Sequence, residues 1–116
     1  MFEPMTRAEL EARIASELPH CTPDDRALYA RAAIAPAKWQ LSPWGDAGGG
    51  FWVIAVHEDR VLWYNDVEDG FNVSCFSRRG DVGEYWCNQD ELRHALPRLA
   101  GELGVRLGPP QPLPEW

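Results

Sequence analysis

The sequence lacks any uninterrupted apolar run of the roughly 18 residues that a membrane-spanning helix needs. Its first residues, Met1-Phe2-Glu3-Pro4, also lack the basic and then apolar segments of a secretory signal. These absences disfavour membrane and secreted classes, and we expect a cytoplasmic location. The length of 116 residues falls within the usual size of a single domain, and such a chain buries enough apolar surface to fold without disulfide or metal support.

Cysteine is scarce, with three residues and no C-x-x-C spacing. An odd number of cysteines in this arrangement favours reduced thiols over a disulfide framework. A disulfide between Cys75 and Cys87 across neighbouring strands remains open at this point. The cysteines and histidines show no zinc-ligand spacing, so the sequence predicts no metal and no cofactor.

Basic residues are few, with 11 lysines and arginines against 18 aspartates and glutamates and a net charge of −7. Residues 57–91 contain nine acids and three arginines, so this part of the chain carries −6 of that charge. An acidic domain without a basic stripe repels a phosphate backbone, which disfavours nucleic-acid binding. A basic protein is the partner that electrostatics favours.

Two helices are predicted in the N-terminal third of the chain. The capping-box pattern Thr6-Arg7-Ala8-Glu9 begins the first helix, which ends at Pro19. Thr22 is a suitable N-cap for a second helix, and Pro36 limits that helix. Residues 37–50 contain several turn and breaker residues and are predicted to form a long connecting loop.

A four-stranded antiparallel meander is predicted in the second half of the chain, followed by a last helix that begins at Asn88 and packs on the sheet. The predicted strands are residues 51–56, 61–65, 71–76 and 83–87. The first two strands carry large apolar residues on both alternating sets, so both faces of the sheet should be covered by helices, by the Trp-containing loop or by a second copy. The predicted fold class is therefore α+β, as one domain over residues 1–116, with a Pro-rich extended tail at 108–116.

The most singular motif is Asn65-Asp66-Val67-Glu68-Asp69-Gly70, an acidic corner between two predicted strands. An EF-hand is excluded because Val67 would occupy a ligand position of the calcium loop. A solvated turn is one interpretation, in which Asn65 or Asp66 bonds the local backbone and Gly70 supplies a positive φ. A protein-binding edge and a metal or catalytic site are the other two.

Tryptophan is abundant, with six residues in this short chain. Trp and Tyr are common energetic anchors of protein interfaces. The predicted partner-binding residues combine the acidic corner with neighbouring aromatic side chains: Asp66, Glu68, Asp69, Trp63, Tyr64 and Trp44. The carboxylates would steer association and pair with Arg or Lys of the partner, while the aromatic side chains would anchor the contact.

Residues 51–56, 61–72 and 84–92 together resemble a family of small uncharacterised bacterial proteins. The small size, the acidity and the helix–sheet–helix order are similar in style to immunity proteins of bacterial toxin systems, including the SUKH type, although no SUKH motif is present. This second resemblance implies an inhibitor that binds a toxin. It assigns a role to no individual residue.

The leading functional hypothesis is a protein-binding module, an immunity- or antitoxin-like inhibitor whose acidic corner occupies a basic site of its partner. One alternative is an enzyme or small-ligand-binding protein with a pocket between the Gly-rich loop 48–50 and the sheet, which would use His57, Cys75 or Asp66. Another alternative is a homo-oligomeric structural domain, such as a homodimer, joined through an apolar face. Because no motif specifies a reaction, an enzyme is not the first expectation.

Overall fold

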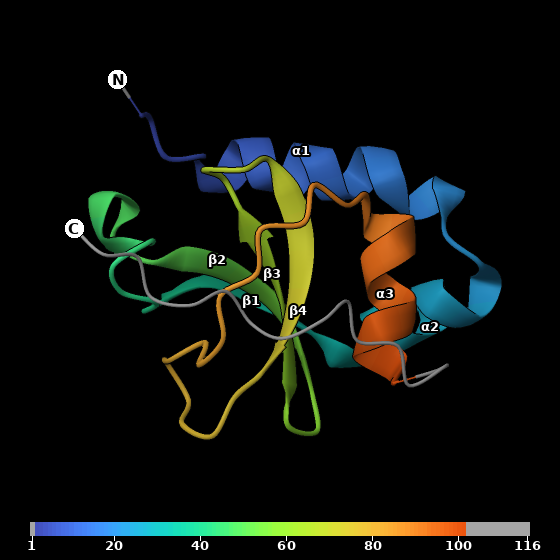
Figure 1. The fold of residues 1–116 in the computed structure, drawn as a ribbon. Coiled ribbons are helices and arrows are strands. Elements are labelled where there is room, and N and C mark those ends of the chain that lie inside the picture. The colour runs from blue at the N-terminus through green and yellow to red at the C-terminus, as the bar shows by residue number, and fades with distance from the viewer. Residues whose placement is uncertain (1, 102–116) are drawn as a thin grey trace.

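The computed structural model describes residues 2–101, which form three α-helices and a four-stranded antiparallel sheet (Figure 1). The helices are α1 (Arg7–Glu17), α2 (Pro23–Ala32) and α3 (Leu92–Ala100), and the strands are β1 (Ala33–Trp39), β2 (Phe51–His57), β3 (Arg60–Asn65) and β4 (Gly70–Cys75). The strands pair in the order β1-β2-β3-β4, which is a meander. The predicted α+β class, with a C-terminal helix packed on an antiparallel meander, is confirmed. The predicted tail at 108–116 lies outside the described residues.

The two N-terminal helices begin where the sequence predicts, because their caps form. In α1 the Thr6 hydroxyl accepts the Glu9 N–H at 3.1 Å, and the Glu9 carboxylate accepts the Thr6 N–H at 2.9 Å. In α2 the Thr22 hydroxyl accepts the Asp25 N–H at 3.1 Å. The second helix ends at Ala32, before the predicted limit, because the backbone turns extended at the next residue and enters β1.

Two predictions about the sheet are wrong. Residues 37–39, predicted to belong to a loop over 37–50, are part of strand β1, and β1 takes the place of the fourth strand that was predicted at 83–87. Pro36 lies where the register with β2 shifts between Ala33 and Ala37, and β1 is an edge strand. Proline is tolerated at such a position because an edge bulge leaves one N–H without a ladder partner. Residues 83–87 form no strand, and they run as an irregular segment whose Tyr85 and Trp86 side chains are buried.

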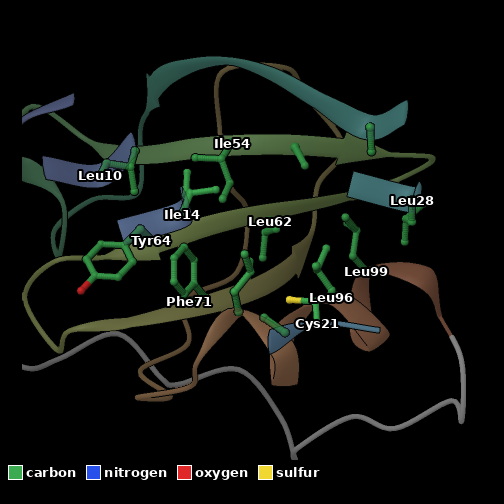
Figure 2. Packing of buried hydrophobic residues seen from close by; sticks show 14 residues of the cluster. Leu10, Ile14, Cys21, Leu28, Ile54, Leu62, Tyr64, Phe71, Leu96 and Leu99 are labelled. Atoms are coloured by element: carbon green, nitrogen blue, oxygen red, sulfur yellow. The ribbon is translucent and has the colours of Figure 1, made fainter. Parts of the chain in front are cut away.

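Both faces of the sheet are covered, as the sequence predicts. On one face the helices contribute Leu10, Ile14, Leu28, Leu96 and Leu99 against Ile54, Leu62, Tyr64 and Phe71 of the sheet (Figure 2). On the other face the connecting segments contribute Leu41, Val82, Tyr85 and Trp86, which pack against Trp39, Phe51, Val53, Val61 and Trp63 of the sheet. Each large side chain that is fully buried in these clusters stabilises the fold by about 1.5–3 kcal/mol.

The segment before α3 runs along the outer edge of β4 and delays the start of the helix. The Phe71 N–H donates to the Asp90 carbonyl at 2.9 Å. The side-chain amide of Asn72 accepts the Asn88 N–H at 3.0 Å and donates to the Asn88 carbonyl at 3.1 Å. Because this pairing holds Asn88 beside the strand, α3 begins at Leu92 instead of at the predicted Asn88.

None of the helices within residues 2–101 is long and apolar enough to cross a bilayer.

Candidate functional site

The turn between β3 and β4 is held by the side chain of Asn65, which is completely buried. Its carbonyl oxygen accepts the N–H groups of Val67 and Glu68, both at 3.1 Å. Its amide nitrogen donates to the Tyr85 hydroxyl at 3.1 Å and to the Trp86 carbonyl at 3.0 Å. The side chain thus uses both donors and both lone pairs. The prediction that Asn65 bonds the local backbone is confirmed.

Gly70 is required for a different reason from the one predicted. The positive φ at this corner belongs to Asp69, with a value of 63°, and not to Gly70. A short polar side chain tolerates this left-handed conformation better than most residues do. A Cβ at Gly70 would lie only 2.3 Å from the Asn88 carbonyl oxygen, so the backbone of β4 needs glycine for this close approach.

The three predicted carboxylates differ in the number of hydrogen bonds and ion pairs that they form within the protein. Asp66 is partly buried and accepts the Met5 N–H at 2.8 Å. Asp69, whose side chain is 70% exposed, accepts the Tyr64 hydroxyl and lies 3.4 Å from the Arg13 guanidinium. The Glu68 carboxylate forms no hydrogen bond or ion pair within residues 2–101. Glu68 and the outer side of Asp69 are therefore available to a partner.

Trp63 and Tyr64 lie in the core, and this burial corrects the expectation that they anchor a partner. Trp63 is fully buried and its indole N–H donates to the Ser74 hydroxyl at 2.9 Å. Tyr64 is 1% exposed, and burial raises its pKa above the ordinary tyrosine value, with the hydrogen bond to Asp69 acting in the same direction. Trp44 is the one predicted aromatic residue that stays partly exposed, stacked on Tyr85 with ring centroids 4.3 Å apart.

The N-terminal segment 2–5 connects the turn to the loop that carries Trp44. Met5 is held from both sides, since its N–H bonds Asp66 and its carbonyl accepts the Trp52 indole N–H at 2.7 Å. At the other end of the segment, a Cβ at Gly48 would lie 3.5 Å from Pro4 and 3.6 Å from the Phe2 ring. The start of α1 and the residues just before it lie beside the β3–β4 turn in Figure 1.

We call the surface formed by residues 2–5, 42–49 and 66–69 the acidic end. Its three segments contain no Lys or Arg and five acids: Glu3, Asp46, Asp66, Glu68 and Asp69. Phe2 and Val67, which are 36% and 48% exposed, are the two exposed large hydrophobic residues among the described positions. Sequence reasoning missed both, although an apolar Val67 between acids in a turn was a usable signal. The acidic end therefore combines negative charge with accessible apolar surface.

The residues of the alternative enzyme hypothesis do not come together. His57 ends β2 and Cys75 ends β4 at one end of the sheet, whereas Asp66 follows β3 at the opposite end. The Gly-rich loop packs on β1, because a Cβ at Gly50 would lie 2.4 Å from the Trp39 carbonyl oxygen. The structure therefore does not bring His57, Cys75 and Asp66 together, and an enzyme that uses one of them stays an alternative hypothesis.

Two other kinds of site were considered in the sequence, a disulfide and a metal-ion site. Cys75 and Cys87 do not form a disulfide with each other in the described structure. Residues 2–101 also contain no group of three or more His, Cys, Asp or Glu side chains placed to hold a metal ion.

Comparisons of the chain with protein-family models, with curated proteins and with solved structures find no match, so the function proposed for the acidic end depends on its own geometry.

Proposed function

We propose that the chain is a protein-binding module, an immunity- or antitoxin-like inhibitor that places the acidic end against a basic site of another protein. The observation that carries this proposal is the coincidence of five acids with the two exposed large hydrophobic residues among the described positions, on three neighbouring segments of which 2–5 and 66–69 are joined by a hydrogen bond. The small size, the acidity and the helix–sheet–helix order, which resemble those of toxin-system immunity proteins, also favour a protein partner.

The acidic side chains of the acidic end would act mainly on the rate at which a basic partner associates. Asp69, which is exposed, and Glu68, which is partly exposed, would steer a basic partner toward the surface before contact. Most of their effect falls on the association rate, because exposed ion pairs contribute only about 0.2–1 kcal/mol each once formed. The nearest cations compete weakly: Arg13 is shared with Glu17, and the Lys38 ammonium is bonded to the Gly48 carbonyl at 2.7 Å.

The apolar residues would supply the affinity that exposed charges do not. Val67 and Phe2 are already exposed, so a partner that covers them gains about 25 cal/mol for each Å² of apolar surface removed from water. Trp44 would add an aromatic anchor whose orientation is fixed by its stack on Tyr85. Because Asn65 and Met5 hold the turn and the segment in place, little ordering entropy is lost on binding.

The test uses a triple variant, Asp66→Asn, Glu68→Gln and Asp69→Asn. The amides keep the oxygen acceptors for Met5 and Tyr64 and remove three negative charges. A protein captured on the immobilised chain is identified and purified, and its association with each variant is measured by biolayer interferometry at low and physiological salt. We expect the association rate to fall on the order of 10-fold at low salt and its salt dependence to weaken.

The matched control removes three exposed acids elsewhere, as Glu11→Gln, Asp59→Asn and Glu91→Gln. It changes the net charge by the same amount and should leave the association rate within about 2-fold of the wild-type value, because these acids lie outside the acidic end. If the two triple variants bind the partner equally well, the acidic end is not the binding surface. Thermal unfolding of both variants verifies that they are folded.

A further inference from the structure

A cavity of about 320 Å³ lies at the other end of the sheet from the acidic end, between α2, the end of β2 and α3. Four polar side chains line it: Asp24, Asp25 and Arg31 from α2, and His57 from β2. The apolar part of its wall includes the side chain of Leu28. Cavities of this volume are at the lower limit for organic ligands, so the size favours a small molecule.

Asp25 is the residue that gives the cavity its chemistry. The residue is 7% exposed, and its backbone N–H bonds the Thr22 hydroxyl. Its carboxylate forms no hydrogen bond or ion pair with any of the described residues. The carboxylate oxygens keep contact with solvent through the cavity, because neither is among the fully buried side-chain atoms that lack a partner in the described structure. A cation that enters the cavity would therefore meet an accessible negative charge that none of the described residues neutralises.

Arg31 and His57 add donors at a distance from this carboxylate. Arg31 follows Asp25 by six positions, which places it about 9 Å further along the axis of α2, where it lines the same cavity. Neither the Arg31 guanidinium nor the His57 imidazole forms a hydrogen bond or ion pair within residues 2–101. The cavity therefore presents a carboxylate near the start of α2 and cationic or neutral donors toward its end, with Leu28 between them.

We propose that this cavity binds a short aliphatic primary amine, with the ammonium on the Asp25 carboxylate and the methylene chain against Leu28. Two kinds of molecule share this chemistry. In an ω-amino acid the second end is a carboxylate that Arg31 pairs with, whereas in a diamine the second end is another ammonium that pairs with Asp24 or stays in water. The site is separate from the acidic end and does not depend on the protein-binding proposal.

The experiment titrates γ-aminobutyrate and putrescine into the full chain and follows binding by isothermal titration calorimetry and by amide shifts in ¹H–¹⁵N NMR. Asp25→Asn should weaken binding of the preferred probe by about 10-fold or more, since it removes a charged hydrogen-bond partner. The control Asp59→Asn, an exposed acid outside the cavity, should bind as the wild type does. Arg31→Gln should weaken γ-aminobutyrate and leave putrescine unchanged if the ligand is an ω-amino acid.

A second variant keeps the test independent of the stability of the Asp25 variant. Ala27 lines the cavity and is exposed on α2, so Ala27→Leu fills the space with a good helix former. We expect this variant to lose binding while its urea unfolding midpoint stays near the wild-type value. The proposal is overturned if neither probe shows saturable binding, if Asp25→Asn binds like the wild type, or if Ala27→Leu does so.

Discussion

Replacing Asn65 by Ala is the sharpest test of how the acidic end is held. The variant removes two hydrogen bonds to the turn N–H groups, which water can replace, at about 0.5 kcal/mol each. It also removes two bonds to the buried Tyr85 hydroxyl and Trp86 carbonyl, which are left without a partner at about 1.5 kcal/mol each. The expected loss is about 4 kcal/mol, a large fraction of a typical domain stability of about 5–15 kcal/mol.

Urea unfolding followed by tryptophan fluorescence measures this loss directly, because several of the six tryptophans are buried. The unfolding midpoint should fall by roughly 2 M. Asn88→Ala is the matched control, since the Asn88 side chain forms no hydrogen bond among the described residues, and its effect should stay under about 1 kcal/mol. If Asn65→Ala lowered the free energy of unfolding by no more than Asn88→Ala does, the four hydrogen bonds of Asn65 would not be what orders the turn.

Two further predictions concern the same region. Gly70→Ala should destabilise the chain by about 3 kcal/mol, because its Cβ meets the backbone of Asn88, whereas Gly48→Ala, with contacts no closer than 3.5 Å, should be near neutral by the same urea assay. Burial raises the pKa of Tyr64 above its ordinary value of 10.0, so the unfolded chain releases this proton first and stability should decline as pH rises above about 10. Urea unfolding at about pH 8 and about pH 11 measures the decline, and a decline of equal size in Tyr64→Phe would show that Tyr64 is not its source.

The fold class followed from the sequence because its strongest signals are local. Caps at Thr6 and Thr22 act within one helical turn, and the run that contains β2 is rich in β-branched and aromatic residues. Strand β1 carries no comparable signal. Its residues Ala-Ile-Ala-Pro-Ala-Lys-Trp have weak β-propensity, and Pro36 indicates a break unless the neighbouring strand is already known.

The candidate site was predictable in part, because charge is visible in a sequence and burial is less so. The acidic corner was found from its composition. The expectation that Trp63 and Tyr64 anchor a partner is wrong, because both faces of the sheet are covered and alternation along a strand then does not indicate which side chains are accessible. The contact of residues 2–5 with the turn depends on Met5 and Asp66, which are 61 positions apart, and no periodicity encodes such a contact.

The side chain of Asn72 has a consequence for how the sheet meets other proteins. Its amide pairs with the Asn88 backbone as a peptide group of a neighbouring strand would, and Phe71 pairs with Asp90 beside it. At the opposite edge Pro36 offers no N–H. A foreign strand thus finds mismatched docking positions along either border, which protects the chain against fibril-like stacking and domain exchange through its sheet. The proposed binding surface would then depend on side chains and not on backbone pairing along the sheet edges.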